Sequence, residues 1–201
     1  MTDSALLRSP ELLCRHRSRL LVVDVQEKLI PAIHRGIDLV RRIRFVLEVA
    51  QLFQIPVVVS EQYPHGLGHT VSELAGHPAI GFTFDKERFS AAEGFCKHTG
   101  MSAEMAPDAH DGRSQVVLIG MESHVCILQT GLDLLARGYR VYVAEDAVGS
   151  GSRHDHEIGV QRLRDAGATI CTVESVAFEW CDTAQTDQFR AMSRLVRSLR
   201  D

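Results

Sequence analysis

Three side chains in this sequence could together perform nucleophilic chemistry: Cys126, Asp24 and Lys86. Cys126 follows a predicted strand that ends at Gly120, near the start of a predicted helix. The N–H groups and the dipole at a helix start favour thiolate, the form of cysteine that attacks carbonyl carbon. On position alone a small buried helix residue is the simpler interpretation, because free cysteines are often buried.

Asp24 and Lys86 are the groups that could handle a proton beside such a thiol. Asp24 ends a predicted strand, so its carboxylate could accept the thiol proton and return it to a leaving group. It could equally cap nearby backbone N–H groups. Lys86 lies among charged residues, where a solvated lysine is the ordinary interpretation. Its ammonium would hold the other two groups as anions only if it lay between them.

Alternating strands and helices must position these side chains. Short apolar runs typical of strands buried on both faces lie at 19–24, 55–60, 80–84, 115–120, 139–144 and 168–173. Helices are predicted at 37–53, 127–137, 155–166 and 183–199. This order predicts βαβ units with right-handed crossovers. The expected fold is a single three-layer α/β/α, doubly wound, Rossmann-like domain with a mainly parallel sheet, covering 19–201 after an N-terminal extension at 1–18.

Ligands of doubly wound sheets bind at the carboxyl ends of the strands. The segments expected at that edge include 61–69, 85–89, 121–126 and 146–152. The last is rich in glycine and serine, but it lacks the spacings of phosphate-binding or dinucleotide-binding loops. We interpret it as a loop that leads into a capped helix, so no nucleotide site is predicted.

The composition limits the partners of the protein. Of 201 residues, 45% are hydrophobic and 24% are charged, and the net charge is −4, so neither nucleic acid nor an anionic membrane is an expected partner. No apolar run approaches the ~20 residues of a membrane span. Five widely spaced cysteines without a CxxC pair favour reduced thiols in the cytoplasm. The N-terminal arginines could also belong to a mitochondrial transit peptide, although Asp3 and Glu11 weigh against it.

Two histidine pairs, His65 with His69 and His154 with His156, invite a metal interpretation. Neither pair has a carboxylate partner at a fixed spacing in the sequence, so surface histidines are the better explanation. No metal or other cofactor is predicted.

Six segments that occur in order resemble the isochorismatase-like hydrolases, in particular their branch of cysteine hydrolases with uncharacterised substrates. They are 20–26 (LLVVDVQ), 60–68 (SEQYPHGLG), 86–91 (KERFSA), 120–126 (GMESHVC), 145–148 (EDAV) and 174–179 (ESVAFE). Together they extend over the chain from Leu20 to about Trp180.

The resemblance implies a catalytic triad of Asp24, Lys86 and Cys126. It also implies a cis peptide between Met121 and Glu122, which would turn the backbone N–H groups of Glu122 and Cys126 toward one point as an oxyanion hole.

The same resemblance suggests Gln26, Gln62 and Tyr63 as substrate-binding residues. It further implies a small-molecule substrate and a homo-oligomer.

The implied reaction is hydrolysis of a small amide-like substrate through a thioester at Cys126, with Asp24 as general acid and base and Lys86 as its electrostatic partner. Two departures narrow the substrate. The segment 60–65 lacks the Asp-x-His pattern with which the family's nicotinamidases bind metal, and isochorismatases proper lack the cysteine. Two alternatives remain: a metabolite-binding or scaffold protein that keeps the fold without turnover, and a peroxide-reactive thiol.

Overall fold

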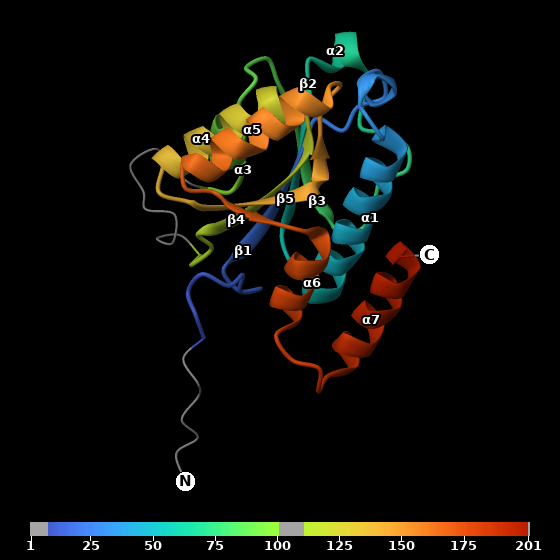
Figure 1. Ribbon diagram of the computed structural model, residues 1–201, viewed down its shortest axis with the longest axis vertical. Coiled ribbons are helices and arrows are strands. Elements are labelled where there is room, and N and C mark those ends of the chain that lie inside the picture. The colour runs from blue at the N-terminus through green and yellow to red at the C-terminus, as the bar shows by residue number, and fades with distance from the viewer. Residues whose placement is uncertain (1–7, 101–110, 201) are drawn as a thin grey trace.

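Six parallel strands form one sheet in the computed structural model of the protein, which describes residues 8–100 and 111–200 (Figure 1). The strands are β1 (Ser18–Val23), β2 (Val57–Gln62), β3 (Ile80–Lys86), β4 (Gln115–Met121), β5 (Arg140–Gly149) and β6 (Thr169–Cys171). Their order is β3-β2-β1-β4-β5-β6, and all neighbouring strands pair in parallel. The chain therefore winds outward from β1 in one direction and from β4 in the other. The predicted doubly wound single domain is confirmed.

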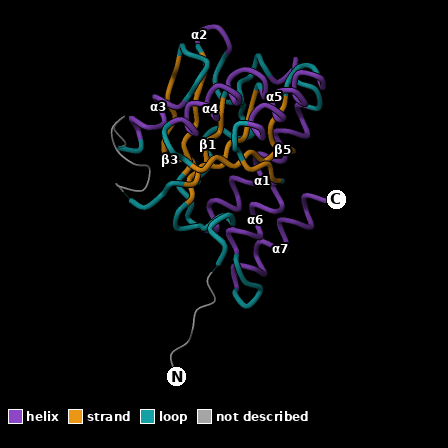
Figure 2. Tube along the Cα trace, turned by 60° about the vertical axis from the view of Figure 1, so that its left-hand side comes forward, coloured by secondary structure: helices purple, strands orange, loops and turns teal. Residues whose placement is uncertain are grey.

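Helices cover both faces of this sheet. They are α1 (Gly36–Phe53), α2 (Pro64–Leu67), α3 (Ala92–His98), α4 (Leu128–Ala136), α5 (Arg153–Asp165), α6 (Val173–Cys181) and α7 (Asp187–Arg200), with a 3₁₀ turn η1 (Ile30–Ala32) and a π-helical turn η2 (Ser123–Ile127). Helices α1, α6 and α7 lie together on one face, and α3, α4 and α5 lie on the other (Figures 1 and 2). None of the described helices has the length and apolar composition needed to cross a membrane.

Alternate residues of each central strand supply the two halves of the core. Leu20 and Val22 pack toward α1 and α6, whereas Leu21 and Val23 pack toward α3 and α4. Because both faces are covered, every residue of β1 is buried, which explains why the strand is a continuous apolar run without alternation.

Several predicted boundaries differ from the structure. The sequence predicts one helix at 183–199, but a separate helix, α6, precedes α7 in the structure. The start of α6 is set by a capping box: Thr172 Oγ1 accepts from Ser175 N at 3.2 Å, and Ser175 Oγ accepts from Thr172 N at 3.0 Å.

Two further elements were missed or shortened in the sequence-based prediction. The short helix α3 was not predicted. Strand β5 extends to Gly149 after an irregularity in its pairing with β4, so the first part of the segment 146–152 is strand rather than loop.

The described part of the N-terminal extension packs on the domain. Leu13 is fully buried, and its backbone N–H donates to Glu179 Oε2 of α6 at 2.7 Å. The main-chain oxygen of Glu179 accepts from the Arg8 guanidinium.

Gly120 allows β4 and β1 to approach closely at the switch point between the two halves of the sheet. Its φ is +123°, and a Cβ there would lie 2.1 Å from the carbonyl oxygen of Val23. Only glycine tolerates both conditions. The residue after Val23 is Asp24, so this close approach brings the ends of β1 and β4 together where ligands bind in such folds.

Candidate active site

Three elements bring Asp24, Lys86 and Cys126 together at the carboxyl edge of the sheet. Asp24 follows β1, Lys86 ends β3, and Cys126 lies in the η2 turn after β4. Lys86 Nζ is 2.8 Å from Asp24 Oδ2 and 3.7 Å from Cys126 Sγ. The ammonium therefore contacts both the acid and the thiol, as a role for Lys86 beside these two groups requires.

Asp24 is fully buried, and its two carboxylate oxygens have different neighbours. Ser60 Oγ donates to Oδ1 at 2.7 Å, and Oδ2 faces Lys86. The backbone N–H of Asp24 also donates to Ser60 O at 3.0 Å, and the residue has a positive φ of 55°. Strand β2 thus fixes the orientation of the acid.

Lys86 is a buried cation rather than a solvated lysine. Its side chain is only 6% exposed, and Nζ donates to Gln62 Oε1 at 2.6 Å and to the main-chain oxygens of Phe89 at 2.9 Å and Arg88 at 3.2 Å. With Asp24 alongside, this ammonium is surrounded by acceptors, as a buried charge requires.

The buried setting of Cys126 opposes the thiolate form that a helix start was expected to favour. Burial, together with the negative charge of Asp24, raises the pKa of the Cys126 thiol to about 12, although the charge of Lys86 acts in the opposite direction. Cys126 is the fourth residue of η2, which begins at Ser123. Burial also raises the pKa of Asp24, against the opposing charge of Lys86. Asp24 and Lys86 already balance each other, so a second anion is unfavourable.

We expect alkylation of native Cys126 by iodoacetamide to be slow at neutral pH and to accelerate with pH. The thiolate is the reactive form, and with a pKa of about 12 its fraction rises about tenfold per pH unit without a plateau below pH 10. Mass spectrometry of each cysteine-containing peptide between pH 6 and 10 measures this profile, with the less buried Cys14 as internal reference. A plateau below pH 8 would contradict the prediction.

The three residues predicted to bind substrate differ in their exposure: the two glutamines are buried, and Tyr63 is exposed. Gln26 is fully buried, and its amide donates to the carbonyl oxygens of Gln62 at 3.0 Å and Gly68 at 2.6 Å while accepting from Gln62 N at 2.8 Å. Gln62 orients Lys86 and donates to Glu87 O at 2.8 Å. Tyr63 is 55% exposed and has a positive φ of 40°. The two glutamines support the site from behind, whereas Tyr63 is available to a ligand.

The turn that carries Cys126 has the cis peptide between Met121 and Glu122 that the resemblance implies. The carbonyl oxygen of Glu122 accepts from the N–H groups of Val125 and Ile127, both at 3.1 Å. Such π-helical turns occur frequently at functional sites.

Two histidines have carboxylate partners that the sequence spacing did not reveal. His69 Nδ1 lies 2.8 Å from Glu61 Oε2, and His156 Nε2 lies 3.0 Å from Glu145 Oε1. The hydrogen bond with Glu61 raises the pKa of His69. These partners come from β2 and β5 through the tertiary fold. Among residues 8–100 and 111–200, no cluster of three or more His, Cys, Asp or Glu residues could hold a metal ion.

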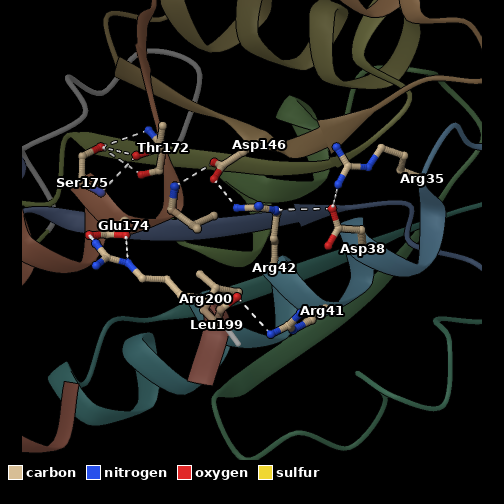
Figure 3. A network of polar contacts seen from close by, with 11 residues as sticks. Arg35, Asp38, Arg41, Arg42, Asp146, Thr172, Glu174, Ser175, Leu199 and Arg200 are labelled. Atoms are coloured by element: carbon tan, nitrogen blue, oxygen red, sulfur yellow. Dashed lines mark hydrogen bonds and ion pairs between the residues drawn. The ribbon is translucent and has the colours of Figure 1, made fainter. Parts of the chain in front are cut away.

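Asp146, also expected at the carboxyl edge, belongs to a separate structural network (Figure 3). Its Oδ2 accepts from Arg42 of α1 at 2.7 Å, and its Oδ1 accepts from the N–H of Val173 at the start of α6 at 2.8 Å. Asp146 therefore ties β5 to α1 and α6, two of the three helices on that face. A cavity of about 370 Å³ beside this network includes Glu145, Ser150 and His156 in its lining but none of the three triad residues.

Sequence reasoning missed Ser60, Ser123 and His156 as residues around the site. Ser60 was detectable, because it ends the predicted strand 55–60 and pairs in register with Val23 beside Asp24. Ser123 and His156 meet only through the packing of α5 on η2, so no signal in the sequence revealed their contact.

The fold and the site define a doubly wound α/β protein with a buried Asp–Lys–Cys cluster at the switch point of its sheet. Residues 18–175 match the family model of the isochorismatase domain. The chain therefore belongs to the isochorismatase family and is an isochorismatase-family hydrolase.

Relatives cover almost the whole chain. The secreted isochorismatase effector Isc1 of Phytophthora sojae is 35% identical over 90% of this chain and 85% of its own length. The structure of the MAR1 ribonuclease from Caenorhabditis elegans is 33% identical, with a TM-score of 0.83 and 92% of both chains covered. The octameric YcaC hydrolase of Escherichia coli shares the fold, with a TM-score of 0.82 over 96% of this chain and 95% of its own, at 21% identity.

Proposed function

We propose that this protein is a cysteine hydrolase that cleaves a small substrate at an amide-like C–N bond through a thioester at Cys126. The observation that carries the proposal is the position of Lys86 Nζ, 2.8 Å from Asp24 Oδ2 and 3.7 Å from Cys126 Sγ. A nucleophile, a base and an orienting charge within contact of one another are the components of covalent catalysis.

In the first half of the reaction, Cys126 Sγ attacks the carbonyl carbon while its proton moves to Asp24. The high pKa of the thiol makes this transfer concurrent with attack, so that no free thiolate accumulates. The oxyanion accepts hydrogen bonds from the backbone N–H groups of Glu122 and Cys126. Protonated Asp24 then donates to the leaving nitrogen, the C–N bond breaks, and a thioester remains.

In the second half, water attacks the thioester carbonyl and gives a proton to Asp24. The C–S bond breaks, the carboxylic acid product forms, and Cys126 recovers its proton from Asp24. Lys86 keeps its charge throughout and stabilises whichever of its two neighbours is anionic. We assign Tyr63 to direct substrate contact. Gln26 and Gln62, which the resemblance suggested as substrate-binding residues, we assign to the support of the site from behind.

The substrate is unlike those of two well-defined branches of the family. Segment 60–65 lacks the Asp-x-His pattern of metal-binding nicotinamidases. Cys126 supports acyl chemistry over the cleavage of a vinyl ether. RNA is disfavoured by the net charge of −4, because nucleic-acid binding draws on phosphate neutralisation.

We also propose that the protein acts in the cytoplasm as a homo-oligomer, with the domain at 19–201 as its working unit. Five free cysteines support a reducing compartment, and the octameric YcaC hydrolase of the same fold supports assembly.

An acyl-enzyme trapping experiment tests the hydrolase proposal. With p-nitrophenyl acetate as an activated ester probe, we expect a burst of p-nitrophenolate and, after acid quenching, an acetyl group on the Cys126 peptide. The other four cysteines serve as controls in the same digest. If acetyl is absent from Cys126 under conditions where the folded protein releases p-nitrophenolate, the thioester mechanism is wrong. Ligand binding without turnover would favour the metabolite-binding alternative.

A further inference from the structure

The three residues that begin the nucleophile turn are each anchored to the segment that runs from the end of β5 into the first turn of α5. Glu122 Oε1 accepts from Gly151 N at 3.1 Å, Ser123 Oγ lies 2.9 Å from His156 Nδ1, and His124 Nδ1 lies 3.0 Å from Ser150 Oγ. A strand can continue into a helix without side-chain contacts of this kind. These three contacts instead hold the backbone of the turn between Met121 and Cys126 in one conformation.

The central anchor continues to a carboxylate. His156 Nε2 lies 3.0 Å from Glu145 Oε1. A carboxylate only accepts, so Nε2 carries the hydrogen that faces Glu145 and Nδ1 pairs with the Ser123 hydroxyl. Glu145 thereby selects the tautomer of His156 that can hold Ser123, in the way that second-layer carboxylates orient functional histidines.

A Ser–His–Glu set has the composition of a hydrolase triad, but this one cannot attack a substrate. Ser123 is fully buried, and it bonds Nδ1, whereas the nucleophilic serine of such triads bonds Nε2. The role of the Ser123 hydroxyl is therefore structural: its hydrogen bond to His156 holds the backbone of the turn in place.

Helix α5 provides a rigid support for this contact. A Cβ at Gly159 would lie 2.7 Å from Ser123 O and 2.9 Å from the Cα of His124, so the backbones of α5 and η2 are in direct contact. His156 lies on the same helix face one turn earlier. Helix α5 thus contacts the turn at two places, through the backbone at Gly159 and through the His156 side chain.

We infer that His156 is a positioning residue for the proposed hydrolase, which holds Cys126 and the Glu122 N–H in reactive geometry through Ser123 while Glu145 fixes its ring. This inference rests on the proposed function for its effect on turnover. Displacements of about 1 Å in a reacting group can cost about 100-fold in rate, so loss of the contact lowers kcat about 10- to 100-fold and leaves KM nearly unchanged, since His156 lies behind the turn.

Two substitutions of His156 test the contacts of its two ring nitrogens separately. The amide of His156→Asn reaches the position of Nδ1 and can still bond Ser123, whereas that of His156→Gln reaches the position of Nε2 and bonds Glu145 instead. We expect His156→Asn to keep kcat for p-nitrophenyl acetate within about threefold of wild type, and His156→Gln and Ser123→Ala to lose about 10- to 100-fold. The double variant Ser123→Ala/His156→Gln should lose no more than either single variant, because both remove one interaction.

A matched control and a second readout keep the test independent of turnover. His154→Ala removes an exposed histidine of the same helix and should leave kcat unchanged. A loosened turn also exposes Cys126, which is 7% exposed in the intact site. We therefore expect iodoacetamide to alkylate Cys126 at least about threefold faster in His156→Gln, with His156→Asn unchanged.

The outcomes distinguish this inference from the proposed function. If turnover requires Cys126 but all His156 variants keep wild-type kcat and alkylation rates, the inference is overturned and the hydrolase proposal stands. If the protein has no turnover, the alkylation rates decide: a difference between the Gln and Asn variants supports the positioning role, and equal rates refute it. Equal losses in the Gln and Asn variants would also refute it, because they indicate general disruption of α5.

Discussion

The Cys126→Ala variant is expected to hydrolyse the ester probe at least about 1,000-fold more slowly than wild type, because removal of a nucleophile eliminates the covalent route and leaves only residual stabilisation by the site. The side chain is small and 7% exposed, so the fold should persist at a cost of about 1 kcal/mol. Steady-state turnover and thermal unfolding measured together separate these two effects.

Cys96→Ala is the matched control for this prediction. Cys96 is also a buried free cysteine, and burial raises the pKa of its thiol as well, but it lies in α3 beside Tyr139. Its replacement should keep turnover within about twofold, since it touches no reacting atom. A Cys126→Ala protein that kept the wild-type rate would remove Cys126 from the mechanism and contradict the proposed thioester intermediate.

Asp24→Asn should change two properties in opposite directions. Turnover should fall about 1,000-fold, because the general base and acid is lost in both halves of the reaction. Alkylation of Cys126 by iodoacetamide near pH 7 should become faster. The charge of Asp24 raises the pKa of the thiol and Lys86 lowers it, so removal of the anion leaves the thiolate with a cationic partner. Thiolate is then a larger fraction at neutral pH.

Opposite signs distinguish a proton-transfer role from a structural one. If the substitution only disordered the site, turnover would fall without the thiol becoming more acidic. The pH profile of alkylation, compared with wild type on folded protein, therefore shows whether the charge of Asp24 acts on Cys126 in an intact site. A profile in Asp24→Asn that is unchanged or displaced to higher pH would contradict the assignment.

Ser60→Ala is the control for the environment of the acid. It removes the 2.7 Å hydrogen bond to Asp24 Oδ1 but keeps the carboxylate, so turnover should fall only about tenfold. Asp24→Asn also leaves Lys86 without its anionic partner, and breaking a buried pair can cost about 3–5 kcal/mol. Rates should be compared well below the unfolding temperature of each variant.

The sequence by itself determined the fold class, and the resemblance of its six segments to the isochorismatase-like hydrolases supplied the three candidate catalytic residues. Continuous apolar runs such as 19–24 and 115–120 predict strands buried on both faces, and their alternation with amphipathic helices leaves few topologies. Because parallel strands end at a common edge, Asp24 and Cys126 could be expected near each other. The expected proximity of Asp24 and Cys126 needs only the pattern of residues within each strand and the rule that parallel strands end at the same edge of a sheet.

The sequence patterns predicted the helix boundaries near the C-terminus less accurately, because they missed α6. The nine residues of α6 combine apolar side chains with Glu174, Ser175 and Glu179, and a segment this short gives too little periodicity to separate helix from strand. The capping box of Thr172 and Ser175 decides for helix, since it satisfies donors that a helix start leaves free.

Only the tertiary structure decided the charge state of the site and its supporting contacts. A helix start predicts an acidic thiol, but burial and the charge of Asp24 raise the pKa of Cys126 instead, and both depend on side chains distant in sequence. Likewise, Ser123 and His156 meet because α5 packs directly on η2 at Gly159. Desolvation and side-chain contacts depend on residues that are distant in the sequence and meet only in the folded chain. The patterns that predict strands and helices depend on residues that are close in the sequence.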